Sequence, residues 1–219
     1  MLKPVFTFNS RANHCGRLLL VLSFILAVLT SLSHAGTAKQ TANILVLGDS
    51  ISAGYGFDPA LGWVTLLSEH IPPDYTVINA SVSGETSAGG LNRLPTLLTE
   101  HQPNIVIIEL GGNDGLRGYP VINLRKNLQA LINLSIDAGA QPLILGMKIP
   151  PNYGKRYTEA FADSYKKIAE TNDLPWVDFF LDDIATNSSL MQSDGIHPNA
   201  DAQVLIVQKV LPALTPLLN

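Results

Sequence analysis

The chain has 219 residues, of which 46% are hydrophobic, and this suits one folded domain once any targeting segment is removed. Three of its 14 basic residues and none of its 18 acidic residues lie before residue 36, so residues 36–219 carry a formal net charge of −7, which argues against nucleic acid as a partner. The single cysteine, Cys15, also precedes residue 36, which excludes thiol catalysis, thiolate metal sites and iron–sulfur clusters from the rest of the chain.

The first 35 residues have the pattern of a secretory signal peptide. Three basic residues precede the 15-residue apolar run 18–32, and small residues at Ser33 and Ala35 mark a cleavage site after Ala35. An uncleaved membrane anchor is the alternative, but a helix needs about 20 apolar residues to span a bilayer. We therefore predict a signal peptide at 1–35, a mature domain at 36–219 that is periplasmic or secreted, and no stable membrane anchor.

Beyond this leader, strand-like and helical segments alternate. Five apolar runs are typical of strands: Ile44–Leu47, Thr76–Asn79, Ile105–Leu110, Leu143–Met147 and a weaker one at Trp176–Phe180. Five segments between or after them have helical character: Leu61–Ile71, Ser87–Glu100, Val121–Ala138, Arg156–Thr171 and Ala200–Leu214. Strands that are apolar on both faces and alternate with helices indicate a parallel sheet covered on both sides. We predict a three-layer α/β sandwich around a central parallel sheet of about five strands.

Polar residues follow three of these strands, at the edge where open α/β sheets bind ligands. The three segments read GDSISAG at 48–54, NASVSGET at 79–86 and ELGGND at 109–114, and a fourth, DGIHP at 194–198, precedes the last helix. Because the carboxyl ends of parallel strands meet at one edge of the sheet, we expect a functional site there.

Ser50 and His197 are the candidates for nucleophilic catalysis. A serine hydroxyl needs a base to take its proton and a third group to orient that base. His197 lies three residues after Asp194, close enough for the carboxylate to bond its imidazole Nδ1 and leave Nε2 free for Ser50. His70 and His101 each lie at the end of a predicted helix, where a cation is favourable without any catalytic role.

Both motifs also have a purely structural interpretation. Asp194 and Gly195 could form a turn, and Asn199 could cap the helix that follows. Ser50 could likewise cap the segment after the first strand. The small residues Ser52, Ala53, Gly54 and Gly56 favour a functional serine, because they leave the backbone open to an approaching substrate.

Acyl transfer also needs donors for the oxyanion of the tetrahedral intermediate. Three are available at strand ends: the Ser50 N–H, the Gly84 N–H and the side-chain amide of Asn113. Each could instead be an ordinary loop residue. We assign Asp49 and Asp114 to loop-tying hydrogen bonds with backbone N–H groups.

Together the four segments resemble the SGNH, or GDSL, hydrolase family, whose fold is a flavodoxin-like α/β sandwich. That family has a serine in a GDS motif, then a glycine, then an asparagine in G-x-N-D and finally D-x-x-H. In this sequence the matching residues, in the same order, are Ser50, Gly84, Asn113, Asp194 and His197. The resemblance implies that Ser50, Asp194 and His197 are catalytic and that Ser50, Gly84 and Asn113 form the oxyanion hole.

Longer matches are similar to the exported acyl-CoA thioesterase I, lysophospholipase or arylesterase subgroup. They are ILVLGDSISAGYG at 44–56, IIELGGNDGLRG at 107–118, PPNYGKRYTEAF at 150–161 and SDGIHPNADAQ at 193–203. The resemblance implies a periplasmic serine esterase acting on acyl esters, acyl thioesters and lysophospholipids. It also implies acyl-groove contacts, for which packing that stiffens the loops is an equal alternative, at Gly112, Leu116, Ile149, Pro150 and Tyr153.

Two other functions stay open on the sequence alone. A carbohydrate acetylesterase could use the same residues, although it would need a polar groove with aromatic platforms, and the only tryptophans are Trp63 and Trp176. A periplasmic binding module could hold a ligand at the strand ends without turning it over. The sequence has no metal-ligand cluster and no phosphate-binding glycine motif, so we expect no metal or other cofactor, a small-molecule substrate as partner, and a monomer.

Overall fold

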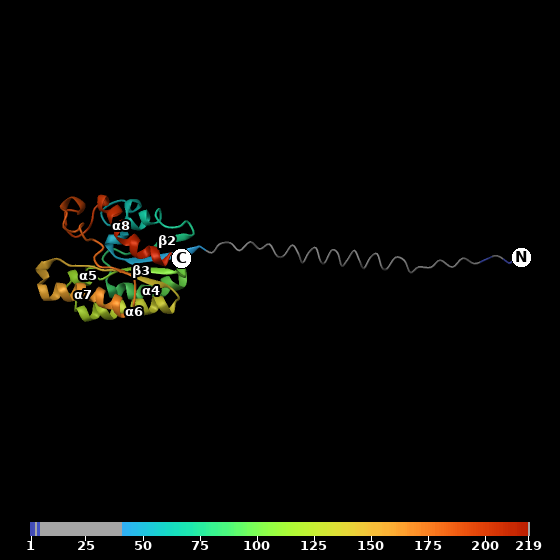
Figure 1. The fold of residues 1–219 in the computed structure, drawn as a ribbon, viewed down its shortest axis with the longest axis horizontal. Helices are drawn as coiled ribbons and strands as arrows, with labels where there is room; N and C mark the ends of the chain where they lie inside the picture. The colour runs from blue at the N-terminus through green and yellow to red at the C-terminus, as the bar shows by residue number, and fades with distance from the viewer. Residues whose placement is uncertain (3, 5–40, 219) are drawn as a thin grey trace. The chain divides into compact units, whose positions relative to one another are not determined.

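A five-stranded parallel sheet forms the centre of the computed structural model, which describes residues 1, 2, 4 and 41–218 (Figure 1). The strands are β1 (Ala42–Gly48), β2 (Tyr75–Asn79), β3 (Ile105–Glu109), β4 (Gln141–Leu145) and β5 (Trp176–Val177). Their order in the sheet is β2-β1-β3-β4-β5, and every neighbouring pair is parallel. This confirms the predicted architecture. The predicted signal peptide and its cleavage site fall outside the described residues.

Helices cover both faces of this sheet. On one face lie α4 (Ser87–His101), α6 (Val121–Asp137) and α7 (Lys155–Thr171), which pack side by side in that order (Figure 1). On the other face, α3 (Trp63–Leu67) packs against α8 (Gln203–Leu214). The short helices α2 (Ser50–Ala53) and α5 (Gly112–Leu116) directly follow β1 and β3 respectively. Five 3₁₀ turns complete the described segments: η1 (Pro59–Leu61), η2 (Pro151–Tyr153), η3 (Ser188–Leu190), η4 (Ala200–Ala202) and η5 (Thr215–Leu217).

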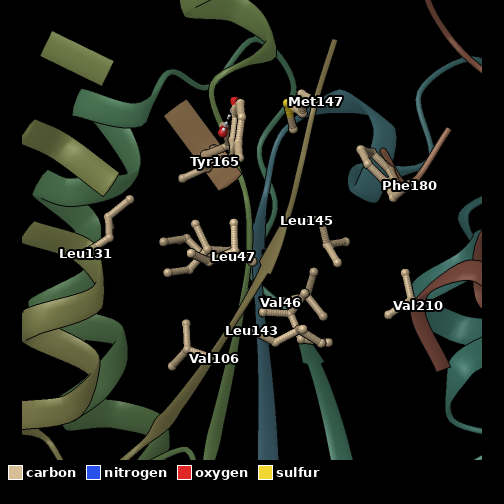
Figure 2. Packing of buried hydrophobic residues seen from close by; sticks show 14 of the residues in the cluster. Val46, Leu47, Val106, Leu131, Leu143, Leu145, Met147, Tyr165, Phe180 and Val210 are labelled. Atoms are coloured by element: carbon tan, nitrogen blue, oxygen red, sulfur yellow. Dashed lines mark hydrogen bonds between the residues drawn. The ribbon is translucent and has the colours of Figure 1, made fainter. Parts of the chain in front are cut away.

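The alternation of side chains along β1 fills the core on both sides of the sheet. Leu47 points toward Leu131 of α6, whereas Val46 and Leu145 of β4 point toward the opposite layer, which includes Val210 of α8 (Figure 2). All five side chains are fully buried. Burying a residue of this size contributes about 1.5–3 kcal/mol, so the strands anchor both helical layers.

The covering helices bury the residues that recur at helical spacing. In α6 these include Leu124, Leu128 and Leu131, and in α7 they include Phe161 and Ile168. Spacings of three and four residues place such side chains on one face of a helix. That face packs on the sheet, and the remaining residues are largely polar. Within 41–218 no helix combines the length and the apolar character needed to cross a bilayer.

Several predicted boundaries were wrong, among them those of three elements: the helix at 61–71, the strand at 176–180 and β4. The predicted helix at 61–71 is helical only at 63–67, because the following amides bond to carbonyls three residues back and form turns. The predicted strand at 176–180 keeps two ladder residues, although Phe180 N–H still donates to Gly146 O at 3.3 Å. Strand β4 begins two residues earlier than predicted and includes Pro142, which pairs in register with Val106.

The strand order determines where a ligand can bind. From β1 the chain crosses to β2 on one side of the sheet and then returns to β3 on the other side. The carboxyl ends of β1 and β3 therefore flank a topological switch point, the place where open α/β sheets bind ligands. Ser50 begins the helix after β1, and Asn113 lies in the helix after β3.

Candidate active site

Ser50 lies at a sharp strand-to-helix turn. Strand β1 ends at Gly48, the Asp49 carboxylate caps α2 by accepting a hydrogen bond from Ile51 N, and Ser50 is the first residue of that helix. Gly54 then ends α2 in the left-handed region, with a φ of 75°, which a glycine adopts without strain. The turn holds the Ser50 side chain at the carboxyl edge of the sheet, 8% exposed.

Folding brings His197 onto Ser50 across 147 residues of sequence. Ser50 Oγ and His197 Nε2 are 2.8 Å apart, and His197 Nδ1 lies 2.6 Å from Asp194 Oδ2. The second carboxylate oxygen, Asp194 Oδ1, accepts hydrogen bonds from the backbone N–H groups of Ile196 (2.9 Å) and His197 (3.0 Å). The carboxylate therefore fixes both the ring and the backbone that carries it.

These hydrogen bonds keep Asp194 ionised. Partial burial by itself raises its pKa, but the bonds from the His197 side chain and backbone and from Ile196 lower the pKa to about 2. A carboxylate that stays charged can orient an imidazole and stabilise its cation. The serine, histidine and aspartate predicted from separate motifs thus lie in one hydrogen-bonded line.

Two residues that the sequence did not single out hold the histidine loop against the serine loop. Gln192 donates from its side-chain amide to Tyr55 O at 2.7 Å and to Pro198 O at 3.0 Å, and its backbone N–H donates to His197 O at 2.8 Å. The Tyr55 ring lies 4.6 Å from the imidazole, centroid to centroid. Asn199 caps the segment after His197 by accepting hydrogen bonds from two backbone N–H groups. The structural role considered for Asn199 is therefore compatible with the hydrogen bonds among Ser50, His197 and Asp194.

Gly84 lies in the loop after β2, with a φ of 79°, and this loop is tied to the end of β1 because Val82 N donates to Gly48 O. The Gly84 carbonyl accepts a hydrogen bond from the Arg117 guanidinium at 3.1 Å, which links this loop to the end of α5. Among the described residues, neither the Gly84 N–H nor the Ser50 N–H donates a hydrogen bond. Both are therefore available to a ligand.

Asn113 contacts the residue that precedes the serine. Its Nδ2 donates to Asp49 Oδ2 at 3.2 Å, which uses one of the two amide hydrogens. Asp114, the next residue, accepts from Ser87 N at 2.8 Å and Ser87 Oγ at 2.6 Å. As predicted, Asp49 and Asp114 tie loops by accepting from backbone N–H groups, and Asp49 additionally orients the Asn113 amide.

An apolar cavity of about 380 Å³ opens beside the hydrogen-bonded line. Four of the five predicted acyl contacts line it: Gly112, Leu116, Ile149 and Pro150. The fifth, Tyr153, does not line the cavity. Its hydroxyl donates to Leu116 O at 2.7 Å, so it supports one wall from behind.

Much of the remaining lining comes from residues that the sequence did not single out. It is built from residues after β5 and around the histidine loop: Phe179, Phe180, Leu181, Ala185, Thr186, Met191, Gly195 and Ile196. Ile51, Met147, Lys148 and Pro151 complete the lining. Lys148 pairs with Asp178 at 3.6 Å and lies 5.2 Å from the centroid of the Phe179 ring. Beyond Phe179 and Phe180, which belong to the weak predicted strand at 176–180, the segment is mostly turns, so no periodicity marked its apolar residues in advance.

Known proteins are similar to this chain in sequence and in fold. The GDSL-like Lipase/Acylhydrolase family matches residues 46–205. Esterase TesA of Pseudomonas aeruginosa is 48% identical over 202 residues, which are 91% of this chain and 98% of that protein. Thioesterase 1/protease 1/lysophospholipase L1 of Escherichia coli K12 is 43% identical over 198 residues, 90% of this chain and 93% of that one.

One solved structure has the same fold, and nearly the whole of that protein superposes on this chain. The psychrotrophic esterase EstA from Pseudoalteromonas sp., in a structure inhibited by monoethylphosphonate, is 45% identical and superposes with a TM-score of 0.76, covering 80% of this chain and 97% of that one. All four motifs lie inside the matched range 46–205. The chain therefore belongs to the GDSL-like lipase/acylhydrolase family, and the resemblance seen in its motifs is confirmed.

Proposed function

We propose that this protein is a serine esterase and thioesterase that hydrolyses acyl esters, acyl thioesters and lysophospholipids through an acyl-enzyme on Ser50. The observation that carries the proposal is the line Ser50 Oγ–His197 Nε2–Asp194, with separations of 2.8 and 2.6 Å, beside an apolar cavity. The names of the relatives, an esterase and a thioesterase/lysophospholipase, support the same substrate classes.

In the proposed reaction, Ser50 Oγ attacks the acyl carbonyl carbon while His197 Nε2 takes the hydroxyl proton. Asp194 accepts a hydrogen bond from Nδ1–H, which fixes the tautomer and stabilises the imidazolium. Collapse of the tetrahedral intermediate breaks the bond to the leaving group, which His197 protonates. A water molecule then attacks the acyl-enzyme, His197 takes its proton, and the acid is released with Ser50 regenerated.

The oxyanion is assigned to the Ser50 N–H, the Gly84 N–H and the free hydrogen of Asn113 Nδ2. The first two donate to no other described residue, and Asp49 holds the amide of Asn113 through its other hydrogen. Donors that are already oriented stabilise the developing charge without reorganisation. The largely apolar cavity lining favours an acyl chain over a sugar, so we place the acyl chain between Leu116 and Ile149 on one wall and Phe179 on the other.

We further propose that the enzyme acts outside the cytoplasm, after removal of residues 1–35. The basic start, the apolar run and the small residues before Gly36 support this proposal. Expression of the full chain in a Gram-negative host should yield a periplasmic or secreted protein whose N-terminal sequence begins at Gly36. Recovery of a purified protein that still begins at Met1 would contradict the assignment.

Replacing the nucleophile tests the central assignment. Ser50→Ala should abolish covalent labelling by a fluorophosphonate and turnover of nitrophenyl acylates, acyl thioesters and lysophospholipids, because Ser50 is the one hydroxyl within residues 41–218 that hydrogen-bonds to His197 Nε2. Labelling is read by intact mass and turnover by product release. Ser68→Ala, at an exposed position after α3, is the matched control and should label like the wild type. Persistent labelling of Ser50→Ala would refute the nucleophile.

The oxyanion role of Asn113 has a kinetic signature. Asn113→Ala should lower kcat by about 10²–10³ while changing KM little, because the amide stabilises charge that appears in the transition state. Steady-state kinetics on a short-chain nitrophenyl ester measure both constants. Asn133→Ala, at an exposed position of α6, should leave them unchanged. A loss in kcat smaller than about threefold would remove Asn113 from this role.

The rate should also rise with pH between about 5 and 9, because only the neutral imidazole of His197 can accept the Ser50 proton. Asp194, with its pKa lowered to about 2, contributes no step in this range. Burial raises the pKa of Asp49 to about 6, so this carboxyl also titrates there. In Asp49→Asn the rise in kcat/KM should therefore persist, whatever the absolute rate. A flat profile in both proteins would exclude a histidine base.

A further inference from the structure

Glu109, the last residue of β3, lies directly beneath the Ser50 turn and has no role in the proposed reaction. Its side chain is fully buried. Its Oε2 accepts two hydrogen bonds, from Asp49 N at 3.0 Å and from Ser52 Oγ at 2.6 Å. A Cβ atom on residue 48 would lie 2.5 Å from the same oxygen, which is too close. The absence of a side chain at Gly48 therefore lets the carboxyl pack directly against the backbone of the turn. Glu109 thus holds the turn on both sides of Ser50.

The same carboxyl belongs to a buried hydrogen-bond chain that reaches the histidine loop. Ser52 Oγ accepts from Trp63 Nε1 at 3.2 Å, and Trp63 N donates to the Gln203 side chain at 3.0 Å. Gln203 Nε2 in turn donates to Asn199 O at 3.0 Å, two residues after the catalytic-site histidine. Glu109, Ser52, Trp63 and Gln203 are all buried. The chain therefore connects the serine turn to the segment that carries His197.

This carboxyl has no compensating charge. Among the described residues, no lysine, arginine or histidine forms an ion pair with Glu109 or with the neighbouring buried Asp49. The second oxygen, Glu109 Oε1, is buried without a hydrogen-bond partner in this part of the chain. Two adjacent carboxylates shut off from water cannot both be charged without a large free-energy penalty.

Of the two acids, Glu109 is the one whose ionised form its surroundings disfavour more strongly. Burial, and then the negative charge of Asp49, raise the pKa of Glu109 well above 4.5. Burial raises the pKa of Asp49 only to about 6, because the Ile51 N–H, His197 and the Asn113 amide favour its ionised form. The other titratable group facing Glu109 is Tyr165 of α7, whose hydroxyl donates to Leu110 O and whose pKa burial raises well above 10.

We propose that Glu109 is a positioning residue that acts as a neutral carboxylic acid: its Oε2, as the carbonyl oxygen, holds the Asp49 and Ser52 donors, and its proton resides on Oε1. The neutral form satisfies both donors and leaves no uncompensated anion beneath the nucleophile. Ionisation of Glu109 would place a second negative charge beside Asp49 and strain the turn that presents Ser50. The effect on catalysis rests on the proposed function of Ser50, whereas the protonation state does not.

Glu109→Gln and Glu109→Ala separate a neutral anchor from a required anion. Glutamine keeps a carbonyl oxygen for both donors and puts an NH₂ group where the neutral acid has its OH, so it should restore most of the activity that alanine loses. Glu109→Ala should lower kcat on a nitrophenyl ester by about ten- to a hundredfold through misplacement of Ser50. Its KM should change less than about threefold, because the acyl cavity is untouched.

Two kinetic outcomes would overturn the proposal. If Glu109→Gln lost as much kcat as Glu109→Ala, the carboxylate charge would be essential. If Glu109→Ala kept kcat within about threefold of the wild type, Glu109 would not position the nucleophile. Should alanine prevent folding, the stability comparison of the wild type with Glu109→Gln still decides whether the acid is neutral.

The stability comparison measures how the urea unfolding midpoints of the wild type and of Glu109→Gln change with pH. The folded wild type keeps a proton on Glu109 that the unfolded chain has lost above about pH 4.5, so its stability must fall as pH rises through this window. Glu109→Gln removes this proton but retains the contribution of Asp49. The urea midpoint of Glu109→Gln relative to that of the wild type should therefore rise from about pH 5 to 8 and change little below 4.5, whatever the offset between the two proteins.

The control is Glu159→Gln, the same substitution at an exposed position of α7 where the side chain is 62% exposed beside Lys155. Its difference from the wild type should not change with pH. A pH-independent difference for Glu109→Gln as well would show that Glu109 is ionised and overturn the proposal. Loss of fluorophosphonate labelling in the wild type would instead refute the serine mechanism, and the stability data would still report on Glu109.

Discussion

The hydrogen bond between Ser50 Oγ and His197 Nε2 joins two short polar segments that the chain separates by 147 residues. It forms only if β1 and the segment before α8 are held within about an ångström of their relative positions. The sheet provides this constraint, because β1 lies between β2 and β3 and is buried on both faces. A close-packed core has few alternative arrangements, so the geometry at its edge is well defined.

The remaining parts of the site use the same edge of the sheet. The loops after β2 and β3 are drawn toward β1 by specific bonds, from Val82 to Gly48 and from Asn113 to Asp49, while Arg117 joins the two loops at Gly84. Functional groups thus lie on loops and helix starts, where the backbone has free donors, and the strands beneath them stay rigid. The apolar cavity draws on most of this edge, since its walls come from the segments after β3, β4 and β5 and from the histidine loop.

Three carboxyl groups are buried around the turn that carries Ser50. Asp49, Glu109 and Asp114 are all buried without an ion pair in the described part of the chain, and hydrogen bonds to backbone and hydroxyl donors are what hold them. Such groups destabilise a fold unless they are satisfied or neutral, and they cluster where function requires a defined backbone. The orphaned oxygen of Glu109 lies within this cluster, close to the site and far from the purely apolar packing around Leu131.

The sequence by itself determined the order of strands and helices and singled out Ser50, Asp194 and His197 as the candidate residues that folding brings together. Apolar periodicity and short motifs are local properties, so they can be read from neighbouring residues. Only the tertiary structure decided the two-residue length of β5, the cavity wall at Phe179 and Ile196, and the contacts of Tyr55 and Gln192 with the histidine loop. It also decided that Glu109, which reads as the end of an ordinary strand, lies beneath the serine. These features depend on contacts between distant segments, and no local pattern encodes which segments the folded core brings together.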